Sequence, residues 1–495
     1  MVYCGKPSKA CLECRVRRRR CDMTKPSCGQ CLRAGAECTG FRDVHSLRFR
    51  NQSAQVIRKA NTAQASDSPV ATVRKHQPGS DTSDERQQGL IHSWVQQSMH
   101  KLYATPSLPC RDQQPLQFFI HHYISEYAAL SYGRRSSFQS IYSQAPAHGY
   151  LSNVVQAVGM ASLANLHHSP HFRQAAFKRY SSVLRGIRLA LTEPNHTVSE
   201  QLLVTVMLLN LFEIVTCDGI NLSSWNQHER GELALCYLWN LNQLQSPTGR
   251  NIFIHLRTEV LINCLQQRKP IPSMMLKWIA EARRFEDVQE TPAGQLADII
   301  VRICAFISFV KNPSSTDALS RYISEVLSID KELEAWSAKY QNESMTADDL
   351  SHNLSMINTC NLCNCARIIL HETRHQVLLQ RRNLFRLPSS SFHNPILTVS
   401  YTAIRNSIRS ICSSVPIVQA YFRNKQGGIP AGCGMTLIWP LFVAGTASSA
   451  TPTERDWISL QLRQIGESNG LQRAKVASLH VANSNHGSHN NGSSS

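Results

Sequence analysis

The sequence predicts a mostly α-helical protein in which a small metal-bound unit, a flexible linker and a large all-helical domain follow one another. Seven of the 17 cysteines lie in the first 38 residues, which is too dense for ordinary packing. The stretch from Asn51 to Ser93 contains no Phe, Tyr or Trp and is rich in Gln, Ser, Asp and Thr, as linkers are. Beyond about residue 112, apolar residues recur at helical spacing, and alternation long enough for a sheet is absent.

The N-terminal cysteines form a duplicated pattern. Each half has the form Cys-x2-Cys-x6-Cys, and the halves are offset by 17 residues: Cys11, Cys14, Cys21, Cys28, Cys31 and Cys38. No apolar secretory segment precedes them, so we expect reduced thiols and a metal site rather than a disulfide framework.

The number of thiolates decides the type of metal site. One tetrahedral site uses four thiolates and leaves two over, whereas two separate sites need eight. Two of the six cysteines must therefore bridge, which predicts one compact binuclear cluster. Soft thiolates in this geometry favour zinc, so the expected cofactor is Zn²⁺, two ions per chain.

Charge is concentrated beside the cysteines. The chain has 52 Lys and Arg against 34 Asp and Glu, and residues 1–50 alone have 12 against 4. A basic, metal-bound N-terminal unit predicts a nucleic-acid partner. Five arginines lie between the second and third ligands, where they can bond guanine edges or phosphates: Arg15, Arg17, Arg18, Arg19 and Arg20.

Residues 10–38, ACLECRVRRRRCDMTKPSCGQCLRAGAEC, resemble the fungal Zn2Cys6 binuclear zinc-cluster transcription factors, including Pro26 in the loop between the halves. The resemblance implies that the first and fourth cysteines, Cys11 and Cys28, bridge the two metals. It also implies that the first helix enters the major groove of double-stranded DNA. There Arg17 and Arg18 would reach the bases of a CGG-like triplet while Arg15 and Arg20 hold phosphates. The chain departs from the family with Arg18 where Lys is usual, and with Arg19 where an apolar or polar residue is common.

The large C-terminal region reads as a set of helices. Residues 201–215 are apolar almost all round, as in a central buried helix, and residues 175–191 show one apolar face. Prolines such as Pro170, Pro247 and Pro395 are expected in loops between such segments.

This region also resembles a known family, the fungal-specific transcription factor domain. The resemblance implies an α-helical regulatory and effector domain without catalysis. It rests on FFIHHYISEY (118–127), VVQAVGMASLANL (154–166), TVMLLNLFEIV (205–215) with WNQHERGELAL (225–235), and LIWPLFVAG (437–445).

One motif favours an alternative, a zinc metallohydrolase. His371-Glu372-Thr373-Arg374-His375 has the HExxH spacing, in which two histidines bind zinc and the Glu activates water. Arg374 places a cation beside the metal, and the residues of the extended motif are missing. We therefore expect a structural helix and no enzyme, with Cys360, Cys363 and Cys365 as packing residues.

These inferences divide the chain into a Zn2Cys6 DNA-binding domain (8–41), a largely disordered linker (42–111), a helical transcription factor domain (112–482) and a disordered tail (483–495). They predict a nuclear, sequence-specific RNA polymerase II transcription factor that contacts the transcription machinery or co-regulators. By resemblance it is a pathway-specific activator of a biosynthetic gene cluster, typically in secondary metabolism. No run of about 18 apolar residues exists, so no membrane partner is expected. A homodimer stays open, because the apolar residues after the cysteines span less than two heptads. A small-molecule effector, the target genes and the choice between activation and repression also stay open.

Overall fold

A computed structural model of the chain describes residues 10–11, 13–14, 17, 19–24, 27–36, 38, 114–124, 135–192, 199–217, 239–309, 316–341, 350–385, 395–422 and 429–484. It divides into two compact units, Met1–Thr72 and Val73–Ser495. Every helix or strand element within the described residues is a helix, which confirms the predicted fold class. The predicted linker and most of the predicted tail lie outside the described residues.

The helical unit begins with a group of helices around a hairpin. The group contains α5 (Gln114–Phe119), the π-helical turn η1 (Ile120–Ile124), α6 (Arg135–Ser143), α7 (Tyr150–Leu166), α8 (Pro170–Ala190) and α9 (Glu200–Thr216). Helices α7 and α8 pack along each other as the two arms of the hairpin, and α9 and α5 pack against α7.

A second group of longer helices forms the middle of the unit. It contains η3 (Leu241–Gln245), α11 (Pro247–Gln267), α12 (Ser273–Ala282), α13 (Thr291–Phe309), α14 (Thr316–Gln341) and α15 (Leu350–Phe385). Helix α15 packs against α11, α13 and α14, so this long helix is the axis on which the group assembles.

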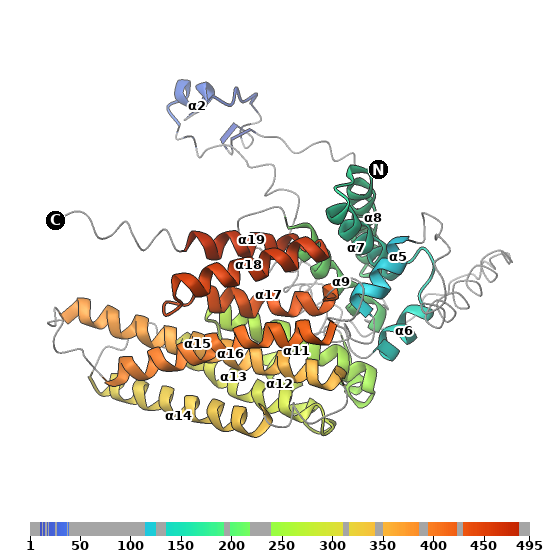
Figure 1. The fold of residues 1–495 in the computed structure, drawn as a ribbon. Coiled ribbons are helices and arrows are strands. Elements are labelled where there is room, and N and C mark those ends of the chain that lie inside the picture. The colour runs from blue at the N-terminus through green and yellow to red at the C-terminus, as the bar shows by residue number, and fades with distance from the viewer. Residues whose placement is uncertain are drawn as a thin grey trace, which may run out of the picture. The chain divides into compact units, whose positions relative to one another are not determined.

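The last group closes the unit. Helices α16 (Pro395–Phe422), α17 (Ala431–Thr446), α18 (Pro452–Asn469) and α19 (Gln472–Asn483) follow in the chain. Helix α17 packs against both α15 and α16, and α17, α18 and α19 also pack against one another. Figure 1 shows these three as a layer beside α15 and α16, with α14 on the opposite side of the unit.

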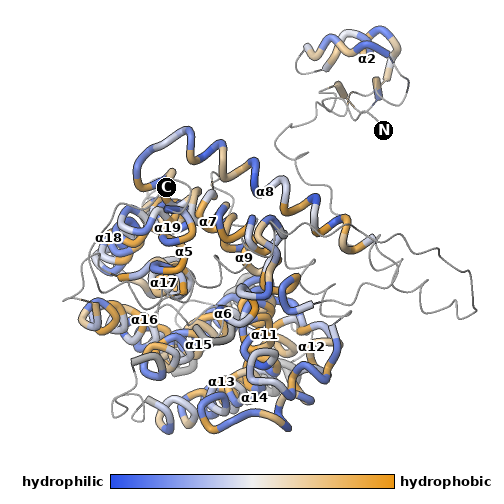
Figure 2. Tube along the Cα trace, turned by 90° about the vertical axis from the view of Figure 1, so that its right-hand side faces the viewer, coloured by the Kyte–Doolittle hydropathy of each residue, from blue (hydrophilic) through white to orange (hydrophobic). Residues whose placement is uncertain are grey.

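The interior is apolar, as the sequence predicts. Eleven residues of α9 are buried, among them Leu202, Leu208 and Phe212, which confirms that residues 201–215 form a core helix. Helix α8 instead buries one stripe, formed by Ala176, Tyr180, Val183 and Ile187, while polar residues recur along the rest of it (Figure 2). The two patterns differ because α9 lies inside the unit and α8 covers its surface.

The buried side-chain amide of Asn165 connects the first and the last groups of helices in the helical unit. Asn165, at the end of α7, donates from Nδ2 to the carbonyl oxygens of Val215 and Gly470, each at 2.7 Å. Gly470 has φ +69°, and a Cβ there would lie 2.8 Å from the carbonyl oxygen of Ser162. Glycine is therefore required where the turn between α18 and α19 approaches α7.

The prolines depart in part from their expected place. Pro170 and Pro247 occupy the first turn of α8 and α11, and Pro395 is the first residue of α16. Proline fits there because the first backbone N–H groups of a helix have no intrahelical acceptor. Pro416 and Pro440 lie inside α16 and α17.

Helix α13 is long and apolar enough over Thr291–Ser308 to cross a membrane, although core helices also pass this test. Its residues Leu296, Ile300 and Ile303 are fully buried in the apolar core of the helical unit. The expectation of no membrane partner stays a prediction.

Candidate metal centre and nucleic-acid interface

The two halves of the cysteine pattern have the same local geometry. Cys28 caps the short helix α2 (Gly29–Arg33), and the backbone N–H of Cys31 donates to Cys28 Sγ at 3.4 Å. In the first half, the backbone N–H of Cys14 donates to Cys11 Sγ, also at 3.4 Å. The Cys-x2-Cys spacing therefore turns both sulfurs of each pair toward one point, and the duplication in sequence is a duplication in structure.

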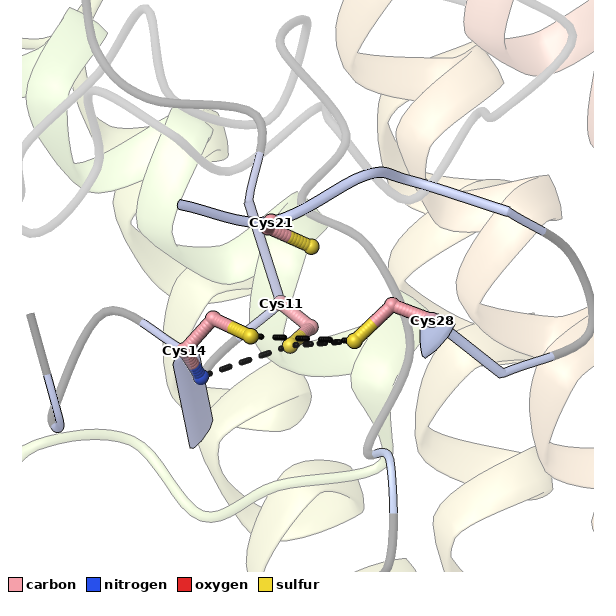
Figure 3. A group of neighbouring side chains, drawn as sticks. All are labelled: Cys11, Cys14, Cys21 and Cys28. Carbon is pink, nitrogen blue, oxygen red and sulfur yellow. Dashed lines mark hydrogen bonds between the residues drawn. The ribbon is translucent and has the colours of Figure 1, made fainter. Parts of the chain in front are cut away.

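The sulfurs of the two halves converge on each other. Cys11 Sγ lies 3.7 Å from the Sγ atoms of both Cys28 and Cys31, and Cys14 Sγ lies 3.6 Å from Cys28 Sγ. Figure 3 shows Cys11, Cys14, Cys21 and Cys28 with their sulfurs directed inward. Cys11 and Cys28 are fully buried, and Cys14 and Cys31 nearly so.

The six sulfurs form two groups of four that share two members. All the sulfurs of a group lie within 4.8 Å of one another, and the groups are Cys11, Cys14, Cys21 and Cys28, and Cys11, Cys28, Cys31 and Cys38. A tetrahedral zinc with Zn–S bonds of about 2.3 Å separates its sulfurs by about 3.8 Å. The observed separations fit this geometry, so the cysteines are positioned to form a binuclear zinc cluster.

Metal binding at these thiols is coupled to proton release. Burial, together with hydrogen bonds among the thiols, raises the pKa of Cys14 to about 12. A hydrogen bond with Cys28 and burial raise the pKa of Cys31 as well. Since zinc binds the thiolate, protons leave these sulfurs when the metal enters.

Asp22 connects the halves in a way the sequence analysis missed. The backbone N–H of Gly29 donates to both oxygens of the Asp22 carboxylate at 3.0 Å, and the Thr24 hydroxyl donates to Oδ1 at 3.1 Å. Burial acts to raise the pKa of Asp22, but the hydrogen bonds from Thr24 and Gly29 outweigh it and the pKa is lowered. A Cβ on Gly29 would lie 2.6 Å from Asp22 Oδ2, so any other residue at the start of α2 would displace this carboxylate oxygen. The signal in the sequence is an acidic residue directly after the third cysteine ligand, Cys21, with glycine directly after the fourth, Cys28.

The arginines that the structure describes are directed outward. Arg17, Arg19 and Arg20 are exposed, whereas Arg15 and Arg18 lie outside the described residues. Arg17 Nε lies 2.6 Å from Glu13 Oε1, an ion pair that sequence reasoning missed although its i,i+4 spacing is visible. The second half has only Arg33 on its helix, and Arg33 Nε donates to the Gly29 carbonyl at 3.2 Å. Exposed positive charge thus gathers on the first half.

The HExxH residues do not form a metal site. His371 is fully buried on α15, with Nδ1 3.1 Å from Ser400 Oγ and Nε2 3.1 Å from Asp330 Oδ1. Glu372 accepts a hydrogen bond from the backbone N–H of Ser448 at 2.7 Å. Within the described residues, groups of ligands suited to a metal ion form only among the N-terminal cysteines.

Comparison with protein families gives two matches. Residues 9–46 match the fungal Zn(2)-Cys(6) binuclear cluster domain. Residues 116–279 and 293–481, which together make up more than half of the chain, match the fungal specific transcription factor domain. Both matches are to transcription factors and not to enzymes, so the metallohydrolase alternative is wrong.

Two curated fungal proteins are similar over a short segment. The lysine biosynthesis regulatory protein of Saccharomyces cerevisiae is 36% identical over 69 residues, which is 13% of this chain and 9% of that protein. The aspercryptin biosynthesis cluster-specific transcription regulator of Emericella nidulans is 30% identical over 60 residues, 12% of this chain and 10% of that protein. The similarity thus spans about a tenth of the length of these relatives. No solved structure matches the chain.

Proposed function

We propose that this chain, which belongs to the fungal specific transcription factor domain family and carries a Zn(2)-Cys(6) cluster domain, is a nuclear transcription activator. It activates genes transcribed by RNA polymerase II and binds CGG-like triplets. DNA binding and a role in transcription follow from the families themselves. The triplet, the polymerase, the nuclear location and the class of target genes are the proposal.

One observation carries the proposal: two four-sulfur groups share Cys11 and Cys28, directly beside exposed arginines. Cys11 and Cys28, which belong to both groups, would be shared by two zinc ions, and Cys14, Cys21, Cys31 and Cys38 would complete the ligand set. Zinc supplies structural cross-links that hold the first helix, and this chain's arginines make the DNA contacts.

The arginines divide into two roles. Arg17 and Arg18 bond guanine O6 and N7 in the major groove, which gives specificity. Arg15 and Arg20 neutralise phosphates, which gives affinity without specificity. Six thiolates and two zinc ions add −2 to a segment whose side chains sum to +8, so the unit keeps about +6 for the DNA.

The target genes are proposed by similarity. The two relatives are named as regulators of lysine biosynthesis and of the aspercryptin biosynthesis cluster. We infer that this chain likewise activates one biosynthetic pathway, with the helical domain contacting co-regulators.

The test is selection of binding sites from random duplexes by the purified full chain, followed by affinities for the selected sequence. CGG-like triplets should be enriched. Arg18→Ala should lose about 1–3 kcal/mol of discrimination at one base, whereas Arg20→Ala should weaken all sequences alike and lower the salt slope by about one unit.

Arg33→Ala is the matched control, because Arg33 is also exposed in the zinc unit but lies on the second half. It should bind as the unchanged chain does. Selection of no triplet, or equal losses for Arg18→Ala and Arg33→Ala, would contradict the proposal.

A further inference from the structure

Helix α8 presents an exposed face that is entirely basic or neutral. Its buried stripe faces the core, and the opposite face bears polar side chains, three of them cationic: His171, Gln174, Lys178, Ser181, Ser182, Arg185 and Arg188. Neither α7 nor α8 contains an Asp or Glu. The two helices of the hairpin therefore carry positive charge and no acidic residue of their own.

The cationic side chains of α8 differ in their hydrogen-bond and ion-pair partners. Arg173 and Arg179, on the flanks of α8, donate to the amide oxygens of Asn165 and Asn153, at 3.3 Å and 2.9 Å. Within the described part of the chain, no carboxylate lies in ion-pair contact with Lys178, Arg185 or Arg188. On the buried side of α8, the Tyr180 hydroxyl donates to Glu213 of α9 at 3.4 Å. This arrangement contrasts with α13 and α14, where Arg302 pairs with Glu325 and Glu332.

We propose that this face of α8 binds the phosphate backbone of the DNA that flanks the triplet held by the zinc cluster. The inference rests on the proposed DNA binding and extends it to a second, sequence-independent contact. At 1.5 Å per residue, Lys178 to Arg188 spans about 15 Å, over which duplex DNA carries about nine phosphates. The hydroxyls of Ser181 and Ser182 on the same face add donors of the kind that bond phosphate oxygens.

The chemistry of the face fits DNA better than an acidic protein. Stable protein interfaces depend on a cluster of buried aromatic or aliphatic anchors. On α8, Leu189 is the single large apolar side chain that is exposed. Dispersed cations and hydroxyls without an apolar anchor are what a phosphate backbone needs.

The covalent connection permits both contacts on one DNA molecule. Between Cys38 and Gln114 lie 75 residues, which can span at most about 250 Å. Once the zinc unit is bound, the helical unit is held near the same duplex at a raised effective concentration. A weak second contact then increases the affinity of the whole chain.

The test uses the full zinc-loaded chain and two duplexes that contain the same triplet, one of about 10 base pairs and one of about 60 base pairs. The test variant combines Lys178→Gln, Arg185→Gln and Arg188→Gln. The matched control combines Lys277→Gln, Arg409→Gln and Arg463→Gln, which remove the same charge from exposed positions on three other helices, α12, α16 and α18. Thermal unfolding of the helical unit verifies that both variants fold.

On the long duplex, loss of three phosphate contacts should lower the salt slope of the test variant by about 2.7. The advantage of the unchanged chain over this variant should then shrink about 40-fold between 50 mM and 200 mM salt. On the short duplex the two should bind alike, and the control variant should match the unchanged chain on both duplexes.

Equal slopes on the long duplex, or equal losses for test and control variants, would overturn the proposal, and an acidic protein would become the better partner. Loss of binding to the short duplex in all the proteins would instead show that the proposed zinc-dependent DNA binding is wrong. The two failures are therefore distinguishable.

Discussion

The two units of this chain bury different chemistry. Among the described residues of the zinc unit, the buried side chains are the thiols of Cys11, Cys14, Cys28 and Cys31, while Leu32 is 68% exposed. In the helical unit, aliphatic and aromatic side chains from every group of helices form one continuous core. A segment of about 40 residues cannot bury enough apolar surface to fold alone, whereas several hundred residues can. Metal–sulfur bonds therefore stabilise the fold of the zinc unit, and apolar burial stabilises the fold of the helical unit.

The units also use arginine differently. In the helical unit, Arg257 and Arg367 are held by Glu286 and Asp330 in partly or fully buried ion pairs. In the zinc unit, Arg19 and Arg20 are exposed. Arginine paired inside a fold fixes helix positions, and arginine left at the surface remains available to DNA.

The largest expected effect separates the units by their dependence on metal. Zinc contributes about 10–16 kcal/mol of apparent binding free energy in small finger peptides. Chelation of zinc from the full chain should therefore unfold the zinc unit and abolish DNA binding, while the unfolding temperature of the helical unit stays unchanged. Metal analysis, circular dichroism and DNA binding on the same sample measure this.

Single substitutions sharpen the result, because Cys28 belongs to both sulfur groups and Cys38 to one. Cys28→Ser should lose both zinc ions, and Cys38→Ser should retain more metal than Cys28→Ser. Equal metal content in the two variants would mean that Cys28 does not bridge.

The next effect is confined to the helical core. Phe212 is 1% exposed and stacks on Tyr180 at a ring-centroid distance of 4.5 Å. Phe212→Ala should lower the free energy of unfolding of the helical unit by about 3–5 kcal/mol through lost burial and the cavity left behind. Urea unfolding measures the loss, and Ser181→Ala, at an exposed position on α8, should change stability by less than about 0.5 kcal/mol. A Phe212→Ala variant with reduced zinc content would contradict the independence of the units.

The smallest effect concerns a buried ion pair and its pH dependence. Burial acts to raise the pKa of Asp330, but His371 and Arg367 outweigh it and lower the pKa to about 2. Since the pKa is lower in the folded state, the carboxylate stabilises the fold above about pH 4, and this contribution disappears as the pH falls toward about 2. Asp330→Asn should therefore cost about 2 kcal/mol at neutral pH and little at pH 2. A stability difference that does not depend on pH would show that the charge of Asp330 is not what stabilises the fold.

Much of the molecule could be predicted from local patterns. The repeated cysteine spacing predicted a binuclear zinc cluster, because a Cys-x2-Cys turn brings two sulfurs together without help from distant residues. The apolar run of residues 201–215 predicted a buried helix, because a helix that is buried on all sides has apolar residues on all its faces. The HExxH motif left a metallohydrolase as an alternative, because its spacing says nothing about the neighbours that α14 and α16 supply.

The sequence by itself determined the metal site, the positive charge on the first half of the cysteine pattern and the α-helical fold class. Each of these depends on residues within about 40 positions of one another. Only the tertiary structure decided which residues meet across long distances. It placed Asn165 between Val215 and Gly470, buried His371 against Asp330 and Ser400, and left one face of α8 exposed. Such contacts depend on how helices pack, and packing is set by complementary shapes over the whole core rather than by any local pattern.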